Sequence, residues 1–196
     1  MLILRKIYTF LLDSVQTFLI AAAVFLFIYA ILFRPFEVKG DSMYPNFHDG
    51  EYVITNLIGF EDLKFYHAEF GTIKLGDVVV FNAPPATQNT DKAYIKRVIG
   101  VPGDTISLKD GAVYLNEKLL DESAYLKSDV KTYGTAFLKD GGSVKVPDNE
   151  YFVMGDNRMY SSDSREWGFI TRDEVVGGSM FVYWPANQMR LIRNPY

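Results

Sequence analysis

The sequence has no cysteine and only two histidines, His48 and His67. The absence of cysteine excludes disulfides, thiolate nucleophiles and cysteine-ligated zinc or iron–sulfur sites. With two histidines, a multi-histidine metal site is disfavoured and a Ser-His-Asp triad has few candidates. We expect both histidines to be surface or structural residues.

The sequence also lacks a basic cluster, repeats and low-complexity segments. Its formal net charge is −4, which argues against nucleic-acid binding, because phosphate recognition needs concentrated Lys and Arg. The acidic balance by itself identifies no partner. A chain of 196 residues has room for one membrane segment and one core-forming domain of roughly 150 residues.

One long segment, residues 14–33, carries no charge at all. A helix of about 20 residues rises ~30 Å, enough to cross the hydrocarbon core of a bilayer. A cleaved signal peptide is the alternative, but its apolar region should be only ~7–15 residues long and end at a small-x-small site. Here Ala21-Ala22-Ala23 is followed by ten further residues of the uncharged run. We therefore predict an N-terminal membrane anchor at 1–35.

The flanking charges leave the orientation of this anchor nearly balanced. Arg5 and Lys6 precede the segment, whereas Arg34 and Lys39 follow it, so the positive-inside count is almost level. We favour a cytoplasmic N-terminus. The preference rests on the absence of cysteine and on the extracytoplasmic chemistry described below.

Beyond Pro35 the pattern changes to short β-type runs separated by Pro-Gly, Asp-Gly, Gly-Gly and Pro-Asp. This spacing is typical of antiparallel sheets and not of βαβ units. The sequence thus predicts a mainly β domain at 36–196. Asp110-Gly111 is a strong hairpin signal, and Thr171 with Glu174 resembles a capping box. The expected strands are 51–55, 77–81, 94–100, 104–108, 112–115, 151–154 and 175–183.

Two stretches interrupt this pattern. Residues 57–74 carry more apolar surface than a solvated loop usually does, and we favour burial in the core over contact with the bilayer surface. Residues 116–147 are more polar and begin and end near predicted strands. We interpret them as a small inserted subdomain and assign no chemistry to it.

The first candidate for chemistry is Ser42, within Gly40-Asp41-Ser42-Met43-Tyr44-Pro45 just after the apolar segment. A turn serine is the simpler interpretation of this hexapeptide. A nucleophilic serine needs a base, and a lysine can replace histidine if burial leaves its amine neutral. Lys96 lies in a predicted strand with apolar neighbours that could desolvate it, while Arg97 should point to the opposite face. A solvent-facing lysine remains the alternative.

The second candidate is the polar stretch 155–168, GDNRMYSSDSREWG. Its short polar side chains predict a hydrogen-bonded loop, with Asp163 and Arg165 as an ion pair. A structural loop or a calcium site is the alternative. Asp156, Asn157 and Asp163 lack the regular spacing and the terminal Glu of an EF-hand loop, which disfavours calcium.

Four segments follow the predicted apolar helix in the order GDSMYP, GDVVVF, YIKRVIGVPGD and GDNRMYSSDSREWG. Together they resemble the signature boxes of the bacterial type I signal peptidases, a family of membrane-bound Ser-Lys endopeptidases. The resemblance covers about residues 14–183 and leaves 57–74 and 116–147 unsupported. It implies a mainly antiparallel β fold with an active site near the outer membrane surface. There the family cuts signal peptides from exported preproteins, with small residues preferred at the first and third positions before the cut.

The resemblance also assigns roles to individual residues. It implies that Ser42 is the nucleophile, that Lys96 is the general base and that Ser161 orients the lysine amine. Asp163 and Arg165 would form a supporting pair, and Asp156 and Arg158 would brace the loop. By position, the residues expected to form a shallow apolar substrate pocket are Val38, Met43, Phe47, Tyr94 and Ile95.

This chain departs from the family pattern at two places. Some members carry a serine two residues before the nucleophile that helps to bind the oxyanion, whereas this chain has Gly40 there. Oxyanion stabilisation should then rest on the backbone N–H of Ser42, with a further main-chain donor at Gly40. Met159-Tyr160 replaces the more usual Asp-Asn pair, which affects the detail of that loop.

The resemblance therefore implies a serine endopeptidase of the bacterial cytoplasmic membrane, single-pass, with its catalytic domain on the extracytoplasmic side. The expected partners are the signal peptides of secreted preproteins and the lipid bilayer, without nucleic acid, metal or cofactor. A LexA-type self-cleaving repressor is the enzymatic alternative, but the apolar segment occupies the place of its DNA-binding domain. A membrane-tethered module that grips peptides without cutting them is the alternative from a different class.

Overall fold

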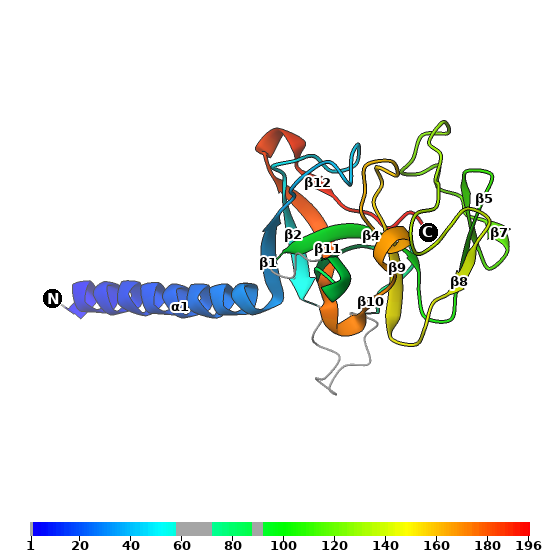
Figure 1. The fold of residues 1–196 in the computed structure, drawn as a ribbon. Helices are drawn as coiled ribbons and strands as arrows, with labels where there is room; N and C mark the ends of the chain where they lie inside the picture. Colours follow the sequence, from blue (N-terminus) through cyan, green and yellow to red (C-terminus); the bar gives the residue numbers. More distant parts are fainter. Residues whose placement is uncertain (1, 58–71, 88–91) are drawn as a thin grey trace. The chain divides into compact units, whose positions relative to one another are not determined.

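The structure is a computed structural model that describes residues 2–57, 72–87 and 92–196 (Figure 1). Its chain divides into two compact units, Met1–Arg34 and Pro35–Tyr196. His67 and most of the predicted apolar stretch 57–74 lie outside the described residues. At the end of that stretch, Ile73 is buried in the core of the second unit.

The first unit is one helix, α1 (Leu2–Leu32). It contains neither Gly nor Pro, and Pro35 lies shortly beyond its end, where proline disfavours further helix. The hydroxyls of Ser14 and Thr17 donate to carbonyls one turn earlier, so these polar groups are satisfied within the helix. Arg5–Phe27 is long and apolar enough to cross a membrane. The helix begins earlier than the predicted segment 14–33 and ends before Phe33, which opens β1.

The second unit is mainly antiparallel β, as the sequence predicts (Figure 1). Among the described residues, the larger sheet has the order β1-β2-β11-β3-β4-β9-β10, with β12 paired to β11. Its strands are β1 (Phe33–Glu37), β2 (Tyr52–Leu57), β3 (Val78–Asn82), β4 (Ala93–Gly100), β9 (Glu150–Met154), β10 (Ile170–Thr171), β11 (Val175–Trp184) and β12 (Arg190–Leu191).

The smaller sheet has the order β7-β6-β5-β8 within the described part of the chain. Its strands are β5 (Thr105–Lys109), β6 (Ala112–Leu115), β7 (Lys118–Leu119) and β8 (Ser143–Lys145). The predicted hairpin is confirmed, because Lys109 pairs with Ala112 and the two turn residues Asp110 and Gly111 have φ values of 54° and 75°. The strands predicted from the sequence all occur, with boundaries within two residues.

Short helical turns connect some of these strands. They are η2 (Pro85–Thr87), α2 (Ser164–Trp167), η3 (Arg172–Glu174) and η4 (Ala186–Gln188). The capping interaction expected before η3 is present, since the Thr171 N–H donates to Glu174 Oε2 at 2.7 Å. The capping prediction is therefore confirmed.

Among the described residues, three apolar clusters form the core of this unit. One contains Val38, Val53, Val80 and Ile95, and it places the start of the domain against β2, β3 and β4. The third cluster includes Leu138 and Val146 together with Phe152 of β9. Segment 116–147 thus contributes buried side chains to the core beside the smaller sheet.

Candidate active site

Ser42 lies in a turn that follows β1. The backbone of this turn is fixed by the buried side chain of Met43 and by hydrogen bonds from Asn157. Met43 is fully buried, which anchors the turn in the core. From the loop after β9, the Asn157 N–H donates to the Ser42 carbonyl at 3.0 Å, and Asn157 Nδ2 donates to the Asp41 carbonyl at 3.0 Å. These bonds fix the position of the Ser42 hydroxyl relative to that loop.

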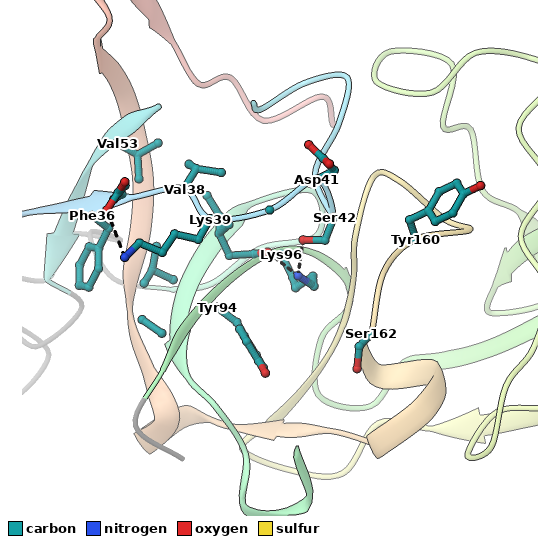
Figure 2. A pocket seen from close by; sticks show the side chains of 15 residues that line it. Phe36, Val38, Lys39, Asp41, Ser42, Val53, Tyr94, Lys96, Tyr160 and Ser162 are labelled. Atoms are coloured by element: carbon teal, nitrogen blue, oxygen red, sulfur yellow. Dashed lines mark hydrogen bonds and ion pairs between the residues drawn. The ribbon is translucent and has the colours of Figure 1, made fainter. Parts of the chain in front are cut away.

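Lys96 lies in the middle of β4, where it is paired with Val79 of β3. Its side chain is 4% exposed. Nζ donates to Ser42 Oγ at 2.7 Å and to the Ile95 carbonyl at 3.0 Å (Figure 2). The amine also lies 5.6 Å from the centre of the Tyr94 ring. A strand and a turn 54 positions apart in sequence therefore bring a hydroxyl and an amine into direct contact.

Burial lowers the pKa of Lys96 to about 8, because the ammonium loses its hydration. Asp163 and Asp156 act in the opposite direction and raise that pKa. The amine is therefore partly neutral in mildly alkaline solution. A neutral amine in contact with a hydroxyl can accept its proton, which is the chemistry required of a general base.

Each of these two carboxylates is held by its own buried arginine. Arg165 donates to Asp163 with Nε and Nη2, both at 2.8 Å, which matches the predicted ion pair. Arg97 donates to Asp156 with Nε at 2.8 Å and Nη2 at 2.7 Å. Both are bidentate pairs, the geometry in which guanidinium and carboxylate bind most strongly. They neutralise the two anions nearest Lys96.

Ser161 does not make the expected bond to the lysine. Its Oγ is buried and has no hydrogen-bond partner among the described residues. The lysine amine instead bonds to the Ile95 carbonyl, because that acceptor is supplied by the residue before it in the same strand. Ser161 nevertheless lies at the site, since it is a close neighbour of Gly155, as is the Ser42 carbonyl.

The expected oxyanion donor at Gly40 is also corrected by the structure. Gly40 has a positive φ of 80°, and its N–H donates to Asp49 Oδ1 at 2.6 Å. A donor already bound to a carboxylate is not free to bind a developing oxyanion. Of the two predicted donors, only the Ser42 N–H remains a candidate.

Asp156 and Arg158 connect the loop after β9 to separate parts of the domain. Besides Arg97, Asp156 accepts from Asn46 Nδ2 at 2.8 Å, so it ties the turn after Ser42 to β4. Arg158 donates to the Gly155 carbonyl at 3.1 Å and to Thr132 Oγ1 at 2.7 Å. Both residues therefore brace the loop, as expected.

The sequence reasoning missed several partners of this loop. Arg97 was expected only to face away from Lys96, yet it is 4% exposed and ion-paired with Asp156. Glu122, in the segment to which no chemistry was assigned, forms an ion pair with Arg158. Buried charges need counter-charges, so the density of acidic and basic residues in 155–168 was the signal for further partners. It could not say which residues they were.

A cavity of about 280 Å³ opens beside Ser42 and Lys96 (Figure 2). Val38, Tyr94 and Ile95 line it, as predicted. Met43 and Phe47 do not, because both are packed into the core cluster beneath it. The remaining apolar and aromatic lining comes from Phe36, Val53, Val80, Ala93 and Tyr160.

Met159 and Tyr160, the second of the two departures from the family pattern, are both strongly exposed. Tyr160 stands at the rim of the cavity on the loop after β9 (Figure 2).

His48 is exposed, and its Nδ1 lies 3.5 Å from Glu51 Oε1. In the described part of the chain, this imidazole therefore pairs with Glu51 and not with Ser42 or Lys96.

A sequence profile of the family described as "Signal peptidase, peptidase S26" matches residues 11–184. Signal peptidase I S of Bacillus subtilis (strain 168) is 41% identical over 184 residues, covering 92% of each chain. Signal peptidase IB of Staphylococcus aureus (strain MRSA252) is 35% identical over 196 residues, covering 94% of this chain and 95% of the relative.

One solved structure is also similar to this chain. A signal peptidase I from Enterococcus faecalis V583 aligns with 55% of this chain and 96% of that chain, with 28% identity and a TM-score of 0.43. The sequence matches place this chain in the class of serine peptidases. Within that class, it belongs to the signal peptidase family, peptidase S26.

Proposed function

We propose that this chain is a membrane-anchored serine endopeptidase that removes signal peptides from exported preproteins with a Ser42–Lys96 dyad. The observation that carries the proposal is the 2.7 Å contact between Lys96 Nζ and Ser42 Oγ at a buried lysine with a pKa of about 8. Membership of the signal peptidase family supports signal peptides as the substrate class.

The chemistry follows from the contact between these two atoms. With the amine neutral, Ser42 Oγ attacks the scissile carbonyl and its proton moves to Lys96 Nζ. Lys96 then passes this proton to the nitrogen of the leaving peptide as the C–N bond breaks, which leaves an acyl ester on Ser42. Water, deprotonated by Lys96, hydrolyses the ester and restores both groups.

The substrate binds in the cavity beside the dyad. Val38 and Ile95 give it apolar walls, and Tyr94 and Lys96 also line it. A volume of about 280 Å³ shared by several substrate residues favours small side chains. The Ser42 N–H stabilises the negative oxygen of the tetrahedral intermediate.

The anchor and the location belong to the same proposal. Helix α1 contains a span, Arg5–Phe27, of sufficient length and hydropathy, and we infer that it crosses the bacterial cytoplasmic membrane once. The catalytic unit then lies on the extracytoplasmic side, where exported preproteins emerge. The site needs no metal or cofactor for the steps described above.

Incubation of the detergent-solubilised protein with a signal-bearing preprotein tests this function. We expect one cut after a small-x-small motif, identified by sequencing the new N-terminus, and no cut with Ser42→Ala. Binding of the preprotein without a cut would overturn the proposal in favour of a membrane-tethered binding module.

A further inference from the structure

Tyr125 lies in segment 116–147, outside the stretches that contain Ser42 and Lys96. It nevertheless contacts Arg97, the partner of Asp156, and Glu122, the partner of Arg158. It is 7% exposed. Its ring covers the guanidinium of Arg97, with the Arg97 Cζ 4.2 Å from the ring centre. Its carbonyl accepts from Asn46 Nδ2 at 2.7 Å. A single residue thus touches the partner of Asp156 and the turn after Ser42.

The ring of Tyr125 closes one side of the Arg97 site. Arg97 Nη1 donates to the Gly76 carbonyl at 3.0 Å, while Nε and Nη2 bind Asp156. The guanidinium plane is therefore fixed by hydrogen bonds at its edges and by an aromatic face above it. Such stacking is a favourable use of arginine, which an aliphatic neighbour cannot reproduce.

The hydroxyl of Tyr125 binds the ion pair of Glu122 with Arg158. It donates to Glu122 Oε1 at 2.8 Å, and Glu122 is ion-paired with Arg158. Tyr196 closes the outer side, because its hydroxyl lies 3.2 Å from that of Tyr125 and the rings meet edge-on. Burial and the charge of Glu122 raise the pKa of Tyr125, so its hydroxyl stays protonated throughout the working pH range.

We propose that Tyr125 is a positioning residue for the Ser42–Lys96 dyad: its ring holds Arg97 against Asp156 and so limits the attraction of Asp156 for the Lys96 ammonium. The inference rests on the proposed function. Tyr125 touches neither reacting atom and acts through Arg97 and Asp156.

The charges around Lys96 define what such a residue can change. The amine is surrounded by two ion pairs and one aromatic ring: Asp163 with Arg165, Asp156 with Arg97, and the ring of Tyr94. Asp156 raises the pKa of Lys96. If Arg97 loses its aromatic cover and neutralises Asp156 less well, the ammonium is favoured and the pKa of Lys96 rises. Cleavage then needs a higher pH, since only the neutral amine acts as base.

The test compares Tyr125→Leu, Tyr125→Phe and a matched control, Tyr114→Leu, in the full-length protein. Tyr114 is a partly buried tyrosine in β6. The pH at which kcat/KM reaches half its maximum reports the free enzyme. We expect Tyr125→Leu to raise it by about 0.5 to 1 pH unit, a fraction of the shift that a fully unmasked neighbouring charge produces. Tyr125→Phe keeps the ring and should shift it by less than half as much, and Tyr114→Leu should leave it unchanged.

A second comparison shows whether the effect passes through Asp156. In an Asp156→Asn background, Tyr125→Leu should no longer shift the midpoint, because the charge that it unmasks is gone. A loss of activity in Tyr125→Leu with an unchanged midpoint would overturn the proposal, since a purely structural role predicts that result. So would a shift that persists in the Asp156→Asn background.

Titration of Lys96 by NMR separates this inference from the proposed function. With 13C at lysine Cε and a Ser42→Ala background, the pKa of Lys96 is measured without any cleavage. Tyr125→Leu should raise it by the same amount, and an unchanged value would refute the positioning role even if the protein cleaves preproteins. Tyr125→Met, whose flexible side chain fills similar space without an aromatic face, is the variant for this titration if Tyr125→Leu does not fold.

Discussion

At the scale of single residues, the buried amine of Lys96 is the feature on which the site depends. An exposed lysine stays charged up to pH ~10.4 and cannot accept a proton near neutrality. Here burial favours the neutral form, and the two carboxylates that would oppose it are each bound by an arginine. The contact with Ser42 then gives this neutral amine a proton to accept.

The first prediction concerns this pair. Ser42→Ala and Lys96→Ala should each lower kcat/KM by at least about 1,000-fold, because one removes the attacking atom and the other its proton acceptor. The double variant should be about as inactive as either single variant, since the two groups act as a unit. Cleavage rates of the three variants, with circular dichroism as the control for folding, measure this. Substantial activity in Lys96→Ala would mean that another base, such as His48, serves the site.

The second prediction concerns pH. The pKa of Lys96 is about 8, and in the proposed mechanism its neutral amine is the base. Cleavage should therefore rise with pH and reach half its maximum near pH 8. Arg165→Ala frees Asp163, which raises the pKa of Lys96, and the rise should move to higher pH. Rate profiles of the parent and the variant measure both midpoints.

Arg165→Lys is the matched control for this shift, because it keeps the positive charge beside Asp163 without the bidentate geometry. Its midpoint should lie between those of the parent and Arg165→Ala. A rise centred near pH ~6.5 that disappears in His48→Ala would exclude lysine as the base.

At the scale of elements, the close approach of two loops positions Ser42. Gly155, directly after β9, donates its N–H to Asp163 Oδ2 at 3.0 Å and lies against the Ser42 carbonyl and Ser161. An added Cβ at Gly155 would collide with both neighbours. This contact explains why a residue without a side chain stands where the two loops meet.

The third prediction follows from that contact. Gly155→Ala should lower kcat by about 100-fold, since a displacement of about 1 Å at a reacting group has that effect. Gly178→Ala is the control, because an added Cβ there meets only Asn56 Oδ1 at 3.4 Å. Cleavage rates with thermal unfolding of both variants measure the difference. Equal activity of Gly155→Ala and the parent would show that the loops can separate without loss of geometry.

The fourth prediction concerns the strands that wall the cavity. Val38 after β1 and Ile95 of β4 are buried and packed together, so the walls cannot easily move apart. A preprotein with leucine at the residue before the cut should have a kcat/KM about 5- to 150-fold below that of the alanine version, because overpacking a rigid pocket costs about 1 to 3 kcal/mol. Equal cleavage of the two substrates would show that this cavity does not hold that residue.

At the scale of the whole molecule, the chain consists of a helical unit and a β unit with separate roles. Every buried residue of the three core clusters belongs to Pro35–Tyr196. The described side chains of α1 are largely exposed and apolar. The helix therefore has no apolar partner of its own within its unit, and a lipid bilayer is the environment that its composition suits.

The fifth prediction separates these roles. A chain that starts at Pro35 should retain its β structure by circular dichroism and cleave a short peptide substrate in solution, because the core and the dyad lie within that unit. It should no longer float with phospholipid vesicles, whereas the full-length chain should. Flotation of the shortened chain would show that the β unit itself binds the bilayer.

Local sequence patterns were sufficient to predict the apolar helix, the short β strands, the Asp110-Gly111 hairpin and the Thr171–Glu174 cap. These features depend on local periodicity and on turn chemistry, which act between neighbouring residues. The sequence also singled out Ser42, Lys96, Asp163 and Arg165 through motifs that resemble a known family. Helix bounds were less well determined, because a helix continues beyond its uncharged part wherever neither Gly nor Pro stops it.

Which of these residues meet depends on the fold of the whole β unit. The contact of Lys96 with Ser42 and the pairing of Arg97 with Asp156 join parts of the chain that are far apart in sequence. Among the described residues, the Ser161 hydroxyl has no hydrogen-bond partner. Likewise, Met43 belongs to the core and Tyr125 to the surroundings of the site. Burial and pairing arise between residues far apart in the chain, and burial sets the pKa of Lys96, so local sequence patterns do not determine them.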